Sequence, residues 1–142
     1  MTARTSSATW RGGLNDGGGD LALGSGAFTG SYSFVSRFED GDGTNPEELL
    51  GAAHAACFSM ALSNMLAQDG NPPNSVHTEA TVHLGTVDGQ PTITHIELKT
   101  VGDVPGLDDA GFQTKAEQAK EGCPVSKLFT GADITLDASL SA

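Results

Sequence analysis

The strongest structural signal in the chain is residues 45–73, which read NPEELLGAAHAACFSMALSNMLAQDGNPP. Asn45 is a favoured N-cap residue, Pro46 fits the first helical position, and Glu48 has the spacing of a capping box. Apolar side chains then recur at helical spacing until a Gly-Asn-Pro-Pro sequence stops the pattern. We therefore predict one long helix from Pro46 to about Asp69, with apolar contacts on most of its sides.

The residues before this helix read as short strands and turns. Residues 9–11 and 21–23 flank a glycine-rich turn and are expected to belong to a hairpin. Residues 32–38 alternate in polarity, which predicts a strand. This strand would carry Arg37 on the face opposite its aromatic side chains.

The residues after the helix predict a hairpin, a second helix and a last strand. The expected elements are strands at 76–86 and 92–101, a helix from about 108 to 122, and a strand at 132–138. Asp88-Gly89 is a strong hairpin signal, and a parity slip between Ile93 and Ile96 predicts a bulge. Because strands and helices are partly segregated, we expect an α+β fold with mainly antiparallel sheet, in a single domain, residues 1–142.

Composition excludes several classes of partner. The chain has 18 acidic and 7 basic residues, a formal net charge of −11, and it would repel phosphate backbones and anionic membrane surfaces. The N-terminus has no apolar signal segment, and the longest apolar stretch, 49–62, is too short to span a bilayer. We therefore expect a cytoplasmic protein with no nucleic-acid or membrane partner, in which a cysteine pair is catalytic, redox-active or merely buried.

Cys57 and Cys123 are the two cysteines of the chain. They are either two small buried apolar side chains or a redox couple in which one thiolate attacks and the other resolves. Burial raises the pKa of a thiol, so an attacking cysteine needs a positive neighbour. Cys123 precedes Pro124 and would cap a short helix whose backbone N–H groups face its sulfur. The residues alone leave open which cysteine attacks first.

Arg37 is the best candidate for the positive neighbour. It alone among the three arginines lies in a strongly alternating segment next to the helix start. The alternative is an ordinary solvated strand residue. A guanidinium in an apolar pocket needs a carboxylate to pair with it. The nearby carboxylates, among which periodicity does not choose, are Glu39, Asp40, Asp42, Glu47 and Glu48.

The histidines favour no metal site. His54 lies three residues before Cys57 and is interpreted as a polar filler or a hydrogen-bond donor near the site, with a general base as the alternative. His77 and His83 are six residues apart on one strand, roughly 20 Å, so they cannot bind one ion together. His54-x-x-Cys57 lacks the second pair of ligands that a zinc site needs. We expect no metal and no cofactor.

Four sequence blocks resemble a known family. They are RFE at 37–39, GTNPEEL at 43–49, GAAHAACFSMAL at 51–62 and GCPVS at 122–126. In these blocks the chain is similar to the OsmC/Ohr family of organic hydroperoxide resistance proteins, and the resemblance covers nearly the whole chain. It implies an OsmC-like fold in which mainly antiparallel sheets wrap around two central helices in an intertwined homodimer.

The resemblance also implies an activity and a site. The activity is that of a thiol-dependent peroxidase that reduces organic hydroperoxides to alcohols in oxidative and osmotic stress defence. It implies that Cys57 is the peroxidatic thiol, Cys123 the resolving thiol, Arg37 the activator of the thiolate and Glu47 the partner of that arginine. The implied reductant is a dithiol, with a lipoylated protein as one candidate.

Helix geometry adds a hypothesis about subunits. On a regular helix Glu47 and Cys57 are about 15 Å apart along the axis and differ by roughly 80° in direction. One guanidinium cannot readily touch both groups, so we predict that part of the Arg37–Glu47–Cys57 cluster comes from a partner chain. Two other functions remain: a non-catalytic stress protein that binds an apolar ligand and has inert cysteines, and a disulfide oxidoreductase, which the absence of Cys-x-x-Cys disfavours.

Overall fold

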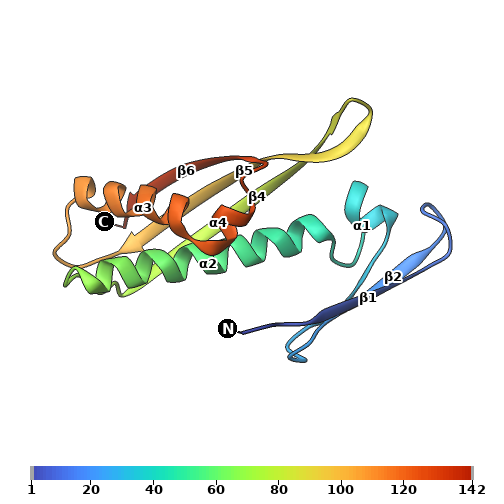
Figure 1. Ribbon diagram of the computed structural model, residues 1–142, viewed down its shortest axis with the longest axis horizontal. Helices are drawn as coiled ribbons and strands as arrows, with labels where there is room; N and C mark the ends of the chain where they lie inside the picture. The colour runs from blue at the N-terminus through green and yellow to red at the C-terminus, as the bar shows by residue number, and fades with distance from the viewer. Residues whose placement is uncertain (1, 142) are drawn as a thin grey trace. The chain divides into compact units, whose positions relative to one another are not determined.

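The computed structural model describes residues 2–141, and Figure 1 labels its elements. The chain divides between Leu49 and Leu50 into two compact units. The elements of the first unit are β1 Ser6–Arg11, β2 Gly18–Leu23, β3 Thr29–Tyr32 and α1 Phe34–Phe38. The long helix α2, Pro46–Gln68, begins at the end of this unit and continues in the second. The remaining elements are β4 Ser75–Val87, β5 Gln90–Asp103, α3 Asp109–Gly122, α4 Pro124–Leu128 and β6 Asp133–Leu140.

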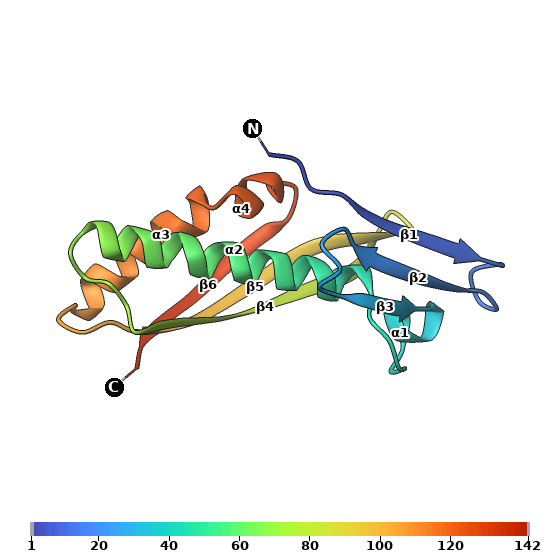
Figure 2. The same ribbon diagram turned by 90° about the horizontal axis from the view of Figure 1, so that it is seen from below.

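The first unit contains a three-stranded antiparallel sheet in the order β1-β2-β3, which Figure 2 shows side by side. Ala8 of β1 lies opposite Leu21 of β2, so the predicted hairpin is confirmed. The Trp10 ring packs at 5.3 Å from the Tyr32 ring, which joins the two outer strands of the sheet.

The predicted strand at residues 32–38 is wrong beyond Tyr32, because a short helix follows. Ser33 caps α1: its hydroxyl accepts a hydrogen bond from the Ser36 N–H at 3.2 Å, and the Ser36 hydroxyl accepts one from the Ser33 N–H at 2.8 Å. Phe34 and Phe38 pack together with ring centroids 4.9 Å apart. Two aromatic residues four positions apart fit one side of a strand and one side of a helix equally well, and the serine capping box selects the helix.

The start of α2 agrees with the sequence, except for one carboxylate. The Asn45 side-chain oxygen accepts a hydrogen bond from the Glu48 N–H at 2.7 Å, as an N-cap residue does. The Glu48 carboxylate does not complete a capping box, because it accepts a hydrogen bond from the Thr44 hydroxyl at 2.6 Å instead. The helix ends before Gly70, whose φ of 87° suits a helix terminus.

The second unit contains a three-stranded sheet in the order β4-β5-β6. Asp88 and Gly89 have φ values of 52° and 76°, as in a tight hairpin turn, and they join β4 to the antiparallel β5. His83 pairs with His95 and Leu84 with Ile93, so the predicted bulge is present. β6 pairs with β5 in parallel, after the chain has passed through α3 and α4.

The core of the second unit lies between α2, α3 and one face of β5, and Figures 1 and 2 show both helices on the same side of the sheet. Its buried members are Phe58, Leu62 and Leu66 of α2, Ile96 and Leu98 of β5, Phe112, Ala116 and Ala119 of α3, and Val104, Cys123 and Ala138. Cys123 is thus part of the core from which the second unit is built.

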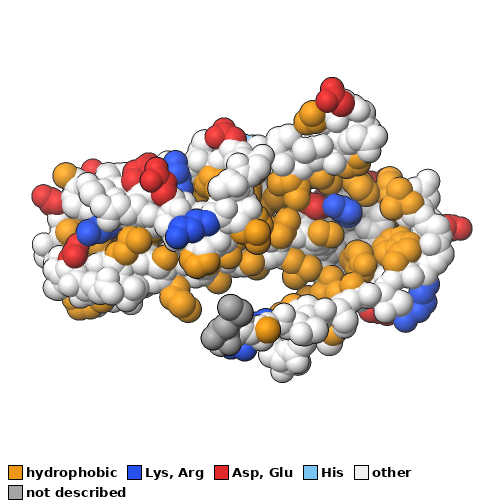
Figure 3. Space-filling model, viewed as in Figure 1, with side chains coloured by type: hydrophobic (Ala, Val, Ile, Leu, Met, Phe, Trp, Pro, Cys, Tyr) orange, Lys and Arg blue, Asp and Glu red, His pale blue; other side chains and the backbone are white. Residues whose placement is uncertain are grey.

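One stripe of α2 is buried, not most of its sides. Within the second unit this stripe consists of Gly51, His54, Phe58, Leu62 and Leu66. Met60 is 76% exposed, and Figure 3 shows apolar side chains at the surface along α2. The prediction of contacts on most sides is therefore wrong for a single chain. By length and composition alone α2 would also fit a membrane span, but a core helix passes the same test, and its buried stripe belongs to the core.

Gly102 of β5 is predicted to be intolerant of a side chain. A Cβ atom there would lie 2.6 and 2.8 Å from ring carbons of Phe112, which is fully buried. We expect Gly102→Ala to lower the free energy of unfolding by about 1–3 kcal/mol, measured by urea denaturation. Gly85→Ala in β4 is the control, because a Cβ there meets its nearest atoms at 3.9 Å. Equal stability of the two variants would contradict this packing.

Candidate functional site

Cys123 is the N-cap residue of α4, as its position before Pro124 predicts. It is fully buried, and its sulfur accepts a hydrogen bond from the Ser126 N–H at 3.3 Å. Its thiol donates a hydrogen bond to the Ser126 hydroxyl at 3.2 Å. The sulfur is therefore held in one position by a single turn of helix, with a backbone N–H that would also stabilise a thiolate.

Cys57 lies beside Cys123. It is half-buried on α2, and its thiol interacts with the Cys123 thiol and with the backbone of Val125. Both cysteines are free thiols. Burial raises the pKa of Cys57, and the neighbouring Cys123 raises it further, whereas the hydrogen bond with Val125 lowers it. The fold brings the two thiols together. The burial of Cys57 and its neighbour Cys123 favour the neutral form of the Cys57 thiol.

Arg37 is paired with Glu47 in the first unit. Its Nε donates to Glu47 Oε1 at 3.0 Å and a terminal nitrogen donates to Oε2 at 2.9 Å, a two-point contact. Glu47 is buried, and the Arg37 guanidinium also lies 5.4 Å from the centre of the Phe38 ring. Arg37 is thus fixed on the last turn of α1, and Glu47 is its partner among the five nearby carboxylates.

The loop between α1 and α2 holds these two residues in place. The Ser36 hydroxyl donates to the Thr44 carbonyl at 2.7 Å, and the Asn45 amide donates to the Ser36 carbonyl at 3.0 Å. Ser36 and Thr44 are buried. These bonds tie α1 to the first turn of α2, where Glu47 lies.

His54 is more closely connected than the sequence suggests. It is fully buried on α2, and its Nε2 lies 2.7 Å from the hydroxyl of Ser126. Burial lowers the pKa of His54, so the ring is neutral near pH 7. Sequence reasoning did not single out Ser126. The sequence signal for Ser126 is its position three residues after Cys123, because an N-cap side chain accepts a hydrogen bond from the backbone N–H at that position.

The remaining histidines lie on the exposed face of the second sheet. His83 is hydrogen-bonded to Glu97 at 2.7 Å, and this contact lowers the pKa of the Glu97 carboxyl. His77 lies 3.9 Å from Glu79. Within residues 2–141 no group of three or more His, Cys, Asp or Glu side chains is placed to hold a metal ion.

Each unit contains an apolar pocket. In the first, a pocket of about 300 Å³ beside Arg37 is lined mainly by Trp10, Leu14, Tyr32, Phe34 and Phe38. In the second, a pocket of about 340 Å³ lies beside α4 and is lined mainly by Leu50, Ile93, Ile96, Leu128 and Phe129.

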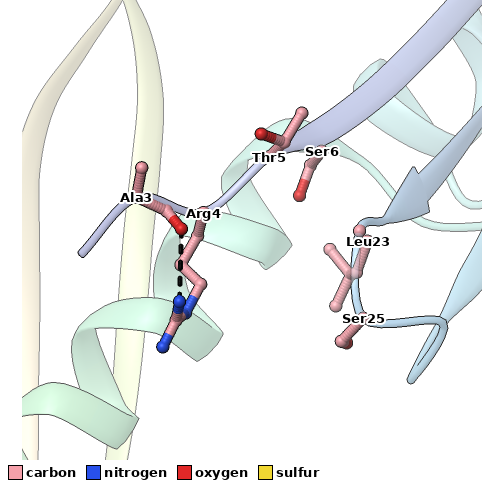
Figure 4. Close-up of a pocket in the computed structure, with 7 residues that line it drawn as sticks. Ala3, Arg4, Thr5, Ser6, Leu23 and Ser25 are labelled. Atoms are coloured by element: carbon pink, nitrogen blue, oxygen red, sulfur yellow. Dashed lines mark hydrogen bonds between the residues drawn. The ribbon is translucent and has the colours of Figure 1, made fainter.

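Another pocket lies at the N-terminal end of the first unit (Figure 4). Its lining includes Arg4, whose side chain turns back to donate a hydrogen bond to the Ala3 carbonyl at 3.2 Å. None of the predicted site residues lines this pocket.

Comparisons with known proteins agree with this architecture. A family model described as OsmC-like protein matches residues 39–138. The chain is 48% identical over 136 residues to Peroxiredoxin OsmC of Escherichia coli (strain K12), which covers 95% of this chain and 94% of that protein. It is 41% identical over 98 residues to the organic hydroperoxide resistance protein of Xanthomonas axonopodis pv. citri (strain 306), covering 68% and 67% of the two chains.

A solved structure shows the same fold. The crystal structure of an organic hydroperoxide resistance protein from Elizabethkingia anophelis superposes with a TM-score of 0.75 at 26% identity, covering 99% of this chain and 97% of that one. The expected α+β fold class is confirmed.

The buried His54 ring predicts a pH dependence of stability. Between its lowered folded pKa and the ordinary value of 6.5, the unfolded chain holds a proton that the folded chain lacks, so the free energy of unfolding rises with pH across this window. We expect the urea concentration at the unfolding midpoint to decrease as the pH is lowered from about 7.5 to about 5.5. His54→Gln should flatten this dependence of the midpoint on pH. His77→Gln, at an exposed histidine, should keep the wild-type slope. An unchanged slope in His54→Gln would show that this histidine does not cause the effect.

Proposed function

The chain belongs to the OsmC-like protein family and is a peroxidase, and we propose that it reduces organic hydroperoxides to alcohols through the thiol of Cys57. The observation that carries this proposal is the interaction of two free thiols, Cys57 and Cys123. A half-buried thiol beside a fully buried one suits a peroxidatic and a resolving cysteine, since the first must meet the substrate and the second must meet the sulfenic acid that forms on the first.

The reaction proceeds in two balanced steps. The Cys57 thiolate attacks the distal oxygen of the hydroperoxide, the O–O bond breaks, and the alkoxide leaves and takes a proton to become the alcohol. Cys57 is then a sulfenic acid. The Cys123 sulfur attacks it, the S–O bond breaks, an S–S bond forms, and one water leaves. A dithiol, of which a lipoylated protein is one candidate, returns the disulfide to two thiols.

The first step needs a cation at Cys57. Because burial and Cys123 both raise the pKa of this thiol, a positive charge must favour the thiolate. Arg37 serves this role, with Glu47 fixing the guanidinium by two hydrogen bonds.

The active protein is a homodimer in this proposal. α2 is apolar along its length, yet Met60 stays 76% exposed, and Leu128 of α4 is also 76% exposed. A second subunit would remove this apolar surface from water. Since Glu47 and Cys57 are ten residues apart on α2, about 15 Å along the axis, the guanidinium that faces Cys57 comes from the partner chain.

The proposal also assigns a domain organisation and a cellular location. The two compact units act as parts of one domain, residues 1–142, because the family match at 39–138 runs across their division. The protein works in the cytoplasm, in oxidative and osmotic stress defence, where dithiol reductants are present.

A second function is a non-catalytic stress protein whose apolar pockets bind a ligand and whose cysteines are inert. The pocket beside α4 favours it, since its lining is almost wholly apolar. A single turnover distinguishes the two functions, because a binding protein keeps both thiols.

We expect the reduced protein to lose both thiols and form one equivalent of alcohol when it receives one equivalent of cumene hydroperoxide. Cys123→Ser should consume one equivalent and stop at the Cys57 sulfenic acid, which dimedone traps and mass spectrometry detects. Cys57→Ser, the matched control, should consume none. Unchanged thiols in the wild type would favour the binding protein, and normal cycling of Cys123→Ser with a dithiol would refute the resolving role.

Mixed dimers test the shared site. Arg37→Ala should slow peroxide attack, by about tenfold for each unit by which the Cys57 pKa rises. When Arg37→Ala and Cys57→Ser chains are combined, each mixed dimer contains one site with both an intact arginine and an intact cysteine. With equal amounts and random pairing, we expect about a quarter of the sites to react at the wild-type single-turnover rate, which no site in either variant alone does. A mixture no faster than Arg37→Ala would place both residues in one subunit.

A further inference from the structure

Three buried side chains form a hydrogen-bonded series that the proposed peroxidase chemistry does not yet use. The Cys123 thiol donates to the Ser126 hydroxyl at 3.2 Å, and this hydroxyl lies 2.7 Å from His54 Nε2. His54 and Cys123 are fully buried and Ser126 is 3% exposed. All three belong to the second unit.

The surroundings of His54 argue against a purely structural role. Among residues 2–141, nothing is hydrogen-bonded to its Nδ1, although that atom is buried. The ring packs edge-on against Phe129, with centroids 5.4 Å apart. An apolar side chain would fill this space without leaving a buried polar atom unpaired, so the imidazole carries a cost that packing does not explain.

The donors and acceptors set a direction for proton movement. The Ser126 hydroxyl has one proton, and it accepts the hydrogen bond of the Cys123 thiol. It is therefore free to donate to His54 Nε2 when that nitrogen carries a lone pair. His54 is then the tautomer with its proton on Nδ1, and the series runs from thiol to hydroxyl to imidazole.

We propose that His54, acting through Ser126, accepts the proton of Cys123 when this thiol attacks the Cys57 sulfenic acid. The inference rests on the proposed peroxidase function and adds a positioning residue to its second step. As the S–S bond forms, the thiol proton passes to Ser126 and the Ser126 proton to His54. The S–O bond breaks, and hydroxide leaves. This hydroxide and the proton held by His54 together make the one water released.

The hydrogen-bonded series of Cys123, Ser126 and His54 acts in disulfide formation and not in peroxide attack. The Cys57 thiol interacts with Cys123 and the backbone of Val125, whereas His54 contacts Ser126. Loss of the imidazole should therefore leave peroxide attack unchanged and slow disulfide formation.

The test separates the two steps in single turnovers with cumene hydroperoxide. Variants His54→Gln, whose amide can still bond Ser126 but is not basic, and Ser126→Ala break the series. Ser59→Ala is the control, because Ser59 is a part-buried serine of α2 bonded to Thr78 at 2.7 Å instead. Alcohol release reports the first step, and trapping of the sulfenic acid against disulfide formation reports the second.

We expect alcohol release to stay within about twofold of wild type, and disulfide formation to slow by roughly a hundredfold in both broken variants. Sulfenic acid then accumulates, and dimedone traps it. Disulfide formation at the wild-type rate in either folded variant would overturn the relay while leaving the peroxidase intact. If wild type releases no alcohol, the peroxidase function fails and the relay with it.

A measurement on the wild type holds even if the variants do not fold. Nitrogen-15 NMR of the histidine rings distinguishes a protonated from an unprotonated ring nitrogen. In the reduced protein we expect His54 to be protonated at Nδ1 and unprotonated at Nε2. A proton on Nε2 would overturn the proposal, because the imidazole would then donate to Ser126 rather than accept from it.

Discussion

The interaction of the Cys57 thiol with the Cys123 thiol is the constraint on which the rest depends. Cys57 comes from the middle of α2 and Cys123 from the break between α3 and α4. The side chains of α2, β5 and α3 pack against one another in the core, and Cys123 is itself a member of that core. Pro124 then begins α4, which fixes the sulfur as an N-cap. The pairing of the two thiols is therefore a product of core packing and not of a local motif.

The two compact units contribute different charged and titratable groups. The second unit holds the thiols in surroundings that raise the pKa of Cys57. The raised pKa favours the neutral thiol, which is a poor nucleophile. The first unit presents a guanidinium already paired with a buried carboxylate. Such a pair is costly to form in isolation but rigid once formed, so the arginine loses little freedom when it meets a thiolate. We propose that peroxide attack begins where the guanidinium of a partner chain faces the Cys57 thiol.

Sequence patterns predicted most elements because their signals are local. The Asn45 cap, the Asp88-Gly89 turn and the Cys123 cap depend on residues within a few positions of each other, and all three are confirmed. The strand prediction at residues 32–38 failed because Phe34 and Phe38 satisfy two periodicities at once. Periodicity did not choose Glu47 among its acidic neighbours; the family resemblance did, and in the structure Glu47 is hydrogen-bonded to Arg37. The contact of His54 with Ser126 joins residues far apart in sequence, and no periodicity predicts it.

Peptide mapping of the oxidised protein tests the central claim most directly. The protein is treated with one equivalent of an organic hydroperoxide, alkylated and digested without reduction. Our account predicts one linked peptide pair that joins Cys57 to Cys123, in a protein that migrates as a single chain on a non-reducing denaturing gel. Cys57 left as a sulfenic acid, or found in bonds between chains, with Cys123 still reduced, would contradict it.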